Sequence, residues 1–555
     1  MNPNVIAHFI STLYAHAHPF LDPRGKEMRR WPGRAGLLSL LLAATLLFTA
    51  CASPMTGAPA PAAVPAQEMA PSPSYAVAAE GSTAGYSTGG TAPVNDAAYD
   101  AVFFKNYGVN PFIDTEDDHL STFAMDVDTA SYSVARRVIQ DGYLPDPASV
   151  RVEEFINYFR HPYPGPEEGA FAIHLEGAPS PFGGANYQLL RVGIQAKRIQ
   201  ADERQDASLV FVIDVSGSMA QENRLGLVQR SLRLLVDELR PTDEVAIVVY
   251  GSRARVVLPP TSGADKNRIL QAINALAPDG STNAEEGLLL GYQLAEEMLR
   301  PDRITRLILC SDGVANVGNT GPDSILKRVQ GYVDQGITLT TVGFGMGNYN
   351  DVLMEQLAND GDGSYAYVDT LEEARRIFVE GLTGTLQVVA RDAKVQVDFN
   401  PEVVSRYRLL GYENRRVDDE DFRNDEVDAG EVGAGHSVTA LYEVKFVKEP
   451  VADAPAATVA IRYQDPESGE VVERSQSIRR EAFHASFQDA SPSFQLDAAV
   501  AEYAELLRES YWAQDGSLSA VRELAQRLTG LMDQDPDVLE FAYLVSQAER
   551  IAGHE

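Results

Sequence analysis

ASLVFVIDVSGSM, from Ala207 to Met219, is the stretch that decides the fold. Its apolar run Leu209–Ile213 is too short for a helix of ordinary length and is rich in β-branched residues, so it predicts a buried parallel strand. Apolar residues at helical spacing follow from Leu225 to Leu239 and predict a helix. The turn between them therefore lies at the carboxyl end of a strand, where open α/β sheets bind ligands.

Three oxygen-bearing side chains occupy that turn: Asp214, Ser216 and Ser218. One carboxylate and two hydroxyls favour a hard cation such as Mg²⁺, which takes oxygen ligands in an octahedron and usually keeps several waters. Two later segments can complete the set: the polar turn 280–283 and the apolar strand 307–311 that runs into Asp312. Spacing alone leaves open whether these segments meet, and helix capping is the alternative role for the Asp and Ser residues.

The order Asp-x-Ser-x-Ser, a loop Thr and a strand-end Asp-Gly resembles the metal-ion-dependent adhesion site of the von Willebrand factor type A domain. In that family the serines and the threonine bind the cation directly or nearly so, and the aspartates bind it or act through water. The resemblance implies a site for Mg²⁺ or Mn²⁺ made by Asp214, Ser216, Ser218, Thr282 and Asp312. Some type A domains keep the fold without using the metal, and that alternative stays open.

The start of the chain predicts a lipoprotein signal peptide at residues 28–51. Basic residues follow Met28, an apolar segment runs from Ala35 to Phe48, and small residues precede Cys51. This pattern resembles the lipobox of bacterial lipoproteins, although Phe48 stands where a Leu is usual, and it implies that Cys51 is lipidated. Residues 1–27 do not show this signal-peptide pattern, so we interpret Met28 as the true first residue of the protein. Residues 52–95 are rich in Pro, Ala, Ser and Gly and predict a disordered tether.

The net charge limits the partners that the protein can bind, and the cysteine content limits its disulfides. The net charge of −33 argues against nucleic acid or an anionic membrane surface as the main partner, and it also keeps a protein soluble. Of the two cysteines, a lipidated Cys51 leaves Cys310 without a disulfide partner. Because Cys310 lies within an apolar strand, we expect it to be a buried small hydrophobe.

The folded part divides into four regions. We expect a multidomain α/β plus β protein whose Rossmann-like, doubly wound type A domain is inserted between segments that form a β-sandwich-like domain. Neither flanking strand set is large enough to close a sheet alone, so strands at 170–196 should pair with strands after Leu386. The regions are an α+β segment at 96–200, the type A domain at 207–384, a β-rich domain at 386–480 and C-terminal helices at 493–552.

Three weaker motifs have structural interpretations. Asp126-x-Asp128 can open an aspartyl phosphatase site, but Leu120–Thr122 does not look like a buried strand, and helix capping by Asp128 or Thr129 is favoured. The acidic segment 418–431 lacks EF-hand register and predicts a solvated loop. The glycines at 343, 345 and 347 predict a tight loop near the metal face rather than a dinucleotide site.

The flanks of the type A domain carry a second resemblance. Segments such as MDVDTASYSVARR, VRVEEFINYF and RLLGYENR are similar to bacterial type A-domain lipoproteins with a C-terminal domain of unknown function. Our first hypothesis is a lipid-anchored module of the cell envelope that binds a protein through the cation. Ala52 rather than Asp follows Cys51, which by the general sorting pattern of lipoproteins favours the outer membrane if the cell has one. We expect a binding module rather than an enzyme. A metal-dependent hydrolase and a structural assembly factor are the alternatives, and His436 and His484 lie far along the chain from the predicted site.

Overall fold

The computed structural model describes residues 104–553, apart from 126–127, 185, 201, 222–223, 314–321, 346–349, 426, 428, 450, 452. Its central part, called here the inserted domain, spans residues 206–386 and contains a six-stranded sheet of order β10-β9-β8-β5-β6-β7. All neighbouring strands are parallel except β7, which forms an antiparallel hairpin with β6. The strands are β5 (Asp206–Asp214), β6 (Glu244–Tyr250), β7 (Arg255–Ser262), β8 (Arg303–Ser311), β9 (Ile337–Phe344) and β10 (Tyr365–Val368).

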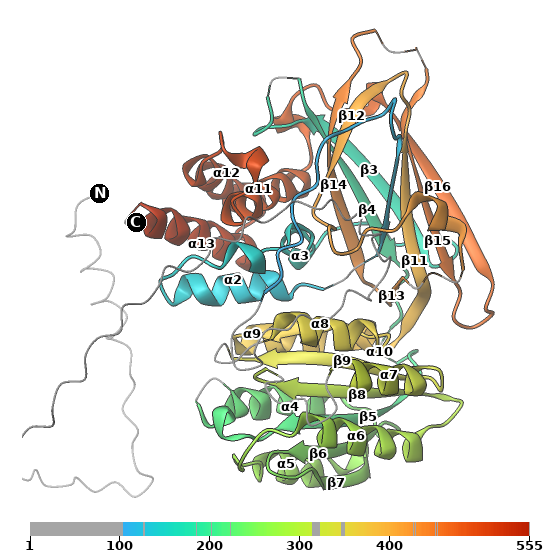
Figure 1. Cartoon of the computed structure of the whole chain (residues 1–555), viewed down its shortest axis with the longest axis vertical. Coiled ribbons are helices and arrows are strands. Elements are labelled where there is room, and N and C mark those ends of the chain that lie inside the picture. Colours follow the sequence, from blue (N-terminus) through green and yellow to red (C-terminus); the bar gives the residue numbers. More distant parts are fainter. Residues whose placement is uncertain are drawn as a thin grey trace, which may run out of the picture. The chain divides into compact units, whose positions relative to one another are not determined.

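Helices cover both faces of this sheet, as a doubly wound domain requires (Figure 1). One apolar cluster joins one face to α6 (Ala284–Met298), α7 (Pro322–Val333) and α8 (Asp351–Asn359). A second cluster joins the other face to α4 (Leu225–Glu238), α5 (Lys266–Asn274) and a C-terminal helical segment. That segment consists of α9 (Leu371–Arg375), the π-turn η4 (Arg376–Glu380) and α10 (Leu382–Leu386).

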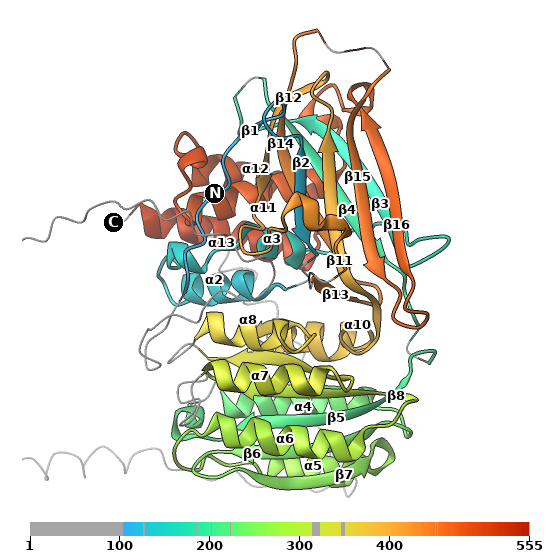
Figure 2. The same cartoon turned by 45° about the vertical axis from the view of Figure 1, so that its right-hand side comes forward.

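Two further sheets pack face to face and are built from chain on both sides of the inserted domain (Figure 2). The first has the order β1-β12-β14-β4-β3. It comprises β1 (Ile113–Asp114), β12 (Val404–Leu410), β14 (Ser437–Phe446), β4 (Gln188–Ala196) and β3 (Phe171–Pro179). The pairing of β4 with β14 confirms the predicted insertion in a β-sandwich.

The second sheet has the order β13-β11-β15-β16, and β2 also pairs with β11. Its strands are β2 (Leu120–Ala124), β11 (Val388–Phe399), β13 (Gly430–Gly433), β15 (Pro455–Gln464) and β16 (Val471–Arg479). Apolar side chains of the two sheets, such as Val192, Tyr442, Val397 and Ile461, share one buried cluster. Successive side chains of a strand point to opposite faces of its sheet, so the apolar residues at every second position form the face that packs inward.

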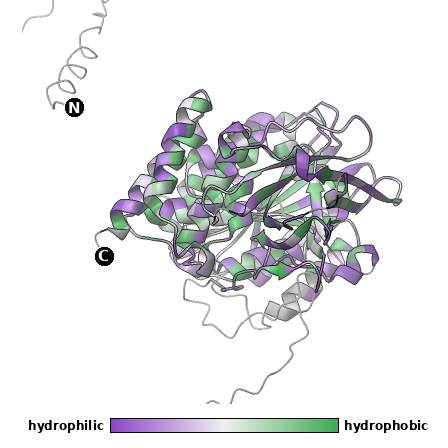
Figure 3. Ribbon diagram, turned by 90° about the horizontal axis from the view of Figure 1, so that it is seen from above, coloured by the Kyte–Doolittle hydropathy of each residue, from purple (hydrophilic) through white to green (hydrophobic). Residues whose placement is uncertain are grey.

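Five helices cover the outer face of the first sheet. They are α2 (Ala130–Gln140), α3 (Val152–Tyr158), α11 (Pro492–Leu507), α12 (Leu518–Leu531) and α13 (Pro536–Ala552). Phe155 and Phe494 are fully buried with Leu441 of β14 in their common core. Figure 3 shows hydrophobic and hydrophilic residues alternating along the helix next to the marked C-terminus, as expected for an element with one face on a core. Among the helices that the structure describes, none has the length and apolar character needed to cross a bilayer.

The segment before α2 differs from the sequence-based expectation. Leu120–Ala124 forms strand β2, and Phe123 is fully buried, because β11 supplies an edge from a distant part of the chain. The N-cap prediction is confirmed in position only, since Thr129 occupies the N-cap of α2 without a side-chain hydrogen bond. Asp128 instead accepts a hydrogen bond from the backbone N–H of Tyr365 at 2.9 Å and pairs with Arg415 at 3.2 Å. It thus ties α2 to strand β10 of the inserted domain.

Buried ion pairs join the inserted domain to the helices above it. Arg136 of α2 donates to Asp369 at 2.6 Å and to Glu373 at 2.8 Å, and all three side chains are almost fully buried. Arg151, at the start of α3, pairs with Asp351 of α8 at 2.7 Å. These paired charges are buried away from water. Separating the inserted domain from the helices would therefore leave buried charges without their partners.

Candidate metal-binding site

The turn after β5 holds Asp214, Ser216 and Ser218 close together. The backbone N–H of Ser216 donates to Asp214 Oδ1 at 2.7 Å, and the Oγ atoms of Ser216 and Ser218 are 3.0 Å apart. Asp214 and Ser216 are buried, with 0% and 2% of their surface exposed, and Ser218 is half-buried. The three oxygen-bearing side chains therefore lie close together at the carboxyl end of the central strand.

Strand β8 brings a second carboxylate to this point, as the sequence predicts. Ser311 Oγ donates to Asp214 Oδ2 at 3.1 Å, and Asp312 follows it in a buried position. Burial raises the pKa of Asp214 to about 6, and the negative charge of Asp312 adds to this rise against the hydrogen bonds from Ser216. Burial also raises the pKa of Asp312. Two ionised carboxylates that are close together and shielded from water raise the free energy of the folded state unless a cation compensates their charge.

The predicted loop after α5 also reaches the site. The backbone N–H of Gly217 donates to the carbonyl oxygen of Gly280 at 2.9 Å. Thr282 lies two residues further on and is half-buried. The three segments named from the sequence therefore meet, although the hydroxyl of Thr282 has no hydrogen bond to any described residue.

Arg224 is a member of the site that the sequence did not reveal. It lies at the N-cap of α4, and its Nη1 donates to Asp312 Oδ2 at 2.5 Å and to the carbonyl of Ser218 at 2.9 Å. Its side chain packs on Gly345, where a Cβ atom would come 2.7 Å from Arg224 Cγ. Gly345 was the available indication, since the glycines at 343, 345 and 347 predicted a tight loop near this face, although they did not identify the side chain that packs there. Gly343 belongs to β9, and Gly347 lies outside the described residues.

The donor set fits a hard divalent cation. Every candidate ligand is a carboxylate or hydroxyl oxygen, which Mg²⁺ prefers over nitrogen or sulfur. Within the described part of the chain, no group of three or more His, Cys, Asp or Glu side chains is arranged to hold a metal, so the hydroxyls of this site would have to share the role. Cys310 is buried and free, as expected, whereas Cys51 lies outside the described residues.

The fold and this constellation define a von Willebrand factor type A domain protein. The family model of that domain matches residues 208–380, and a model described as von Willebrand factor matches residues 98–191. A third model, for the C-terminal part of the uncharacterized protein YfbK, matches residues 384–551. The chain belongs to the family of YfbK from Escherichia coli K12, with 37% identity over 475 residues that cover 81% of each protein.

Two further matches cover a smaller share of the chain. The uncharacterized protein sll0103 of Synechocystis is 27% identical over 286 residues, which are 51% of this chain and 67% of its own. A solved structure, a von Willebrand factor type A protein from Catenulispora acidiphila, covers 68% of this chain and 90% of its own. It does so with 15% identity and a TM-score of 0.42.

Proposed function

We propose that the inserted domain is a binding module that holds a protein partner through a divalent cation, Mg²⁺ or Mn²⁺. The observation that carries the proposal is the convergence of Asp214, Ser216, Ser218 and Asp312 at the strand ends, with the Thr282 loop beside them. The bound ion would offer an open coordination position to an oxygen ligand. The chain's own part is to hold the ligand oxygens in place.

A carboxylate is the partner group that best suits this site. Asp214 and Asp312 bring two negative charges at most, and the hydroxyl ligands are neutral, so a bound dication would not be overcompensated. The overall charge of −33 repels an acidic partner at long range. Recognition must therefore be local, within a Debye length of the site, where the cation dominates.

We further propose that the protein is anchored in the cell envelope through Cys51, on the outer membrane if the cell has one. Support comes from the basic and apolar pattern of residues 28–51 and the tether-like composition of residues 52–95. Such a tether would let the folded head reach away from the lipid surface. Mass spectrometry of the N-terminal peptide decides this point, because an unmodified Cys51 excludes the anchor.

The central test is cation titration of site variants by calorimetry. Asp214→Ala should abolish Mg²⁺ or Mn²⁺ binding, whereas Ser218→Ala should weaken it less because it removes a neutral ligand. Asp302→Ala is a matched control, since Asp302 is exposed and lies at the opposite end of β8 from Asp312. Unchanged cation affinity in Asp214→Ala contradicts the site.

Partner capture is then measured from envelope extracts with the same variants, with and without Mg²⁺. Parallel loss of cation binding and capture supports the proposed role. If Asp214→Ala loses the cation but captures the partner undiminished, the metal is structural and the binding surface lies elsewhere.

A further inference from the structure

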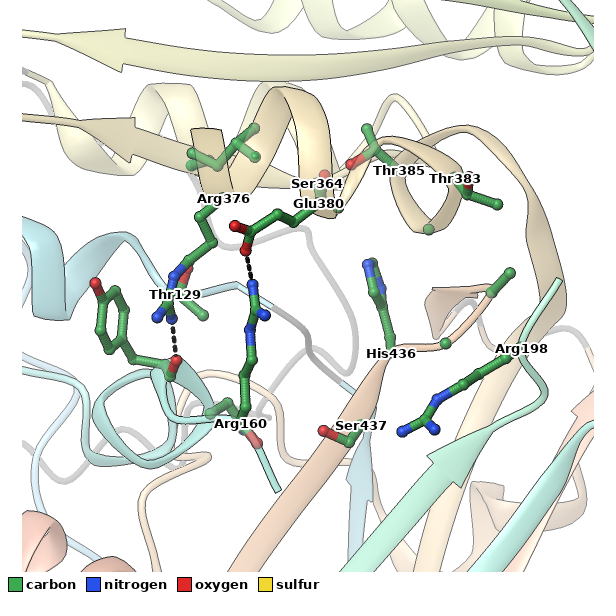
Figure 4. A pocket seen from close by; sticks show the side chains of 18 of the residues that line it. Thr129, Arg160, Arg198, Ser364, Arg376, Glu380, Thr383, Thr385, His436 and Ser437 are labelled. Carbon is green, nitrogen blue, oxygen red and sulfur yellow. Dashed lines mark hydrogen bonds and ion pairs between the residues drawn. The ribbon is translucent and has the colours of Figure 1, made fainter. Parts of the chain in front are cut away.

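A polar cavity of about 530 Å³ lies where the inserted domain meets the β-sandwich (Figure 4). One wall is the C-terminal helical segment of the inserted domain, from Glu373 to Thr385. The opposite wall comes from the end of α3, the segment after β4 and the turn before β14. The volume suffices for a small molecule, and the walls belong to two separately built parts of the protein.

The charge of the lining differs in sign from that of the whole protein. Three arginines and two glutamates line the cavity, in a chain whose net charge is −33. Both glutamates are already paired, Glu373 with the buried Arg136 at 2.8 Å and Glu380 with Arg160. Arg376 is held by Asp537 and by the carbonyl of Tyr158. One positive charge is left uncompensated.

That charge belongs to Arg198, which follows β4. Its side chain is exposed and makes no ion pair or hydrogen bond with any described residue. Its stem lies beside Gly435, where a Cβ atom would be 3.6 Å from Arg198 Cγ. Figure 4 shows the guanidinium on the same side of the cavity as Ser437 and His436. A free guanidinium at the edge of a cavity is a ready partner for a carboxylate or phosphate group.

His436 supplies a second polar group without a partner. Its Nδ1 is buried and has no hydrogen bond among the described residues. The ring lies against the backbone of Gly384, since a Cβ atom there would come 2.6 Å from Nε2. Burial lowers the pKa of His436 to about 4, with a contribution from the charge of Arg306, so the imidazole is neutral at pH 7. The hydroxyls of Ser437, Thr383 and Thr385 complete this end of the lining.

Arg160 lies at the mouth and can contribute a second cation. Its side chain is 64% exposed and that of its partner Glu380 is 41% exposed. An ion pair this exposed to water contributes little to stability, so an incoming anion can compete for Arg160. The cavity therefore offers an anion one free arginine and one that is weakly held.

We propose that this junction cavity binds a small molecule that carries a carboxylate or phosphate group, paired with Arg198. The site is independent of the candidate metal site. Because its walls come from both the inserted domain and the sandwich, the ligand can bind only while the two are docked. Binding should therefore stabilise the folded protein by mass action.

The test titrates the full chain with succinate and with inorganic phosphate, after metal has been removed with a chelator and the chelator itself, which is a carboxylate, has been dialysed away. Calorimetry and thermal unfolding are the two readouts. At least one anion should bind with a dissociation constant of about 1 mM or lower and raise the unfolding temperature, whereas the uncharged succinamide should do neither. Binding of succinate alone assigns a carboxylate ligand, and binding of phosphate alone assigns a phosphate ligand.

Arg198→Gln should weaken binding at least about tenfold, because it removes the uncompensated charge while keeping a polar side chain of similar length. Arg268→Gln is the matched control, since Arg268 is an exposed arginine on α5 that does not line the cavity. Asp214→Ala should bind the anion normally, which separates this site from the metal site. The proposal is overturned if neither anion binds, if succinamide binds equally, or if Arg198→Gln binds as well as Arg268→Gln.

Discussion

Arg224 sets the electrostatic character of the candidate metal site. Its guanidinium lies 2.5 Å from the Oδ2 atom of Asp312, one of the two carboxylates available to a cation. Both side chains are almost fully buried, so their interaction is weakly screened. A positive charge fixed this close to the site opposes the entry of another cation.

We predict that Arg224→Gln binds Mn²⁺ at least about tenfold more tightly than the wild type, because a like charge is removed from a poorly solvated site. Calorimetric titration measures the change. Arg230→Gln, an exposed position on the same helix, should bind as the wild type does. Weaker binding in Arg224→Gln would show instead that the arginine orients Asp312 for the metal.

Glu502 of α11 provides a pH-dependent prediction. Burial raises its pKa from 4.5 to about 8, and the charges of Glu505 and Glu443 add to the rise against that of Arg408. The folded state therefore holds a proton that the unfolded state releases above pH 4.5. The contribution of Glu502 to the free energy of unfolding is therefore highest below pH 4.5 and falls as the pH rises towards 8.

Glu502→Gln removes this titration and should be more stable than the wild type at pH 8 by at least about 1 kcal/mol, with the gain shrinking towards pH 4.5. Urea unfolding at several pH values measures both quantities. Equal stability of the two proteins at pH 8 would contradict the raised pKa.

At this scale the sequence predicted the acidic and hydroxyl residues of the site but not their neighbour. Asp214, Ser216 and Ser218 stand in one short turn, so their proximity is local. Asp312 was added through the resemblance to the type A domain, since spacing alone left open whether its segment meets the turn. Arg224 could not be predicted, since a lone arginine before a helix has many possible partners and only the folded loops select one.

Among the elements, α2 and α3 connect the two halves of the protein. Arg136 reaches from α2 to Asp369 and Glu373, and the hydroxyl of Tyr158 on α3 lies 2.5 Å from its Nη1. Removing one member of such a buried network leaves opposite charges without compensation. The arginine next in sequence, Arg137, makes only a partly exposed pair with Asp141.

Arg136→Ala should therefore lower the free energy of unfolding by about 3–5 kcal/mol. Arg137→Ala on the same helix should change it by less than about 1 kcal/mol, because surface pairs contribute little. Chemical denaturation of the two variants checks the contrast. Similar losses would mean that helix propensity or packing, rather than the buried pairing, holds α2 in place.

The elements of the inserted domain were predictable because each carries its own apolar pattern and turn signals. β2 was not, since Leu120–Ala124 becomes a strand only by pairing with β11. The same dependence on distant partners explains the role of Asp128, which accepts a hydrogen bond from the backbone N–H of Tyr365 while Thr129 takes the N-cap position. Local patterns fail where a tertiary contact supplies the stabilisation.

At the scale of the whole molecule, both described sheets of the sandwich combine strands that precede the inserted domain in the sequence with strands that follow it. β4 pairs with β14 and β2 pairs with β11, so each sheet contains strands from before and after the inserted domain. The inserted domain, in contrast, draws all six strands of its sheet from residues 206–368. The two parts should respond differently when the C-terminal part is removed.

A chain that ends at residue 387 should keep a folded inserted domain but lose the structure of residues 104–200, because β1, β2 and β4 lose their partners β12, β11 and β14 and only the isolated β3–β4 hairpin remains paired. Limited proteolysis with mass spectrometry should show rapid cleavage within 104–200 and resistance within 206–386. The full chain, treated in parallel, should resist in both regions. Protection of residues 104–200 in the truncated chain would show that they fold alone.

The ends of the inserted domain also govern the order in which the chain can fold. Gln396 donates to the hydroxyl of Thr122 across 274 positions of sequence, so the first strands leave the ribosome long before their partners exist. The backbone N–H of Gln205 lies 3.0 Å from the side-chain oxygen of Gln387. Once the inserted domain has folded, it holds its two ends, Gln205 and Gln387, close together. The flanking strands then need to close only a short loop instead of a long one. The central domain is thus an internal nucleus for the sandwich, and refolding should proceed in two sequential phases, the second waiting on the first.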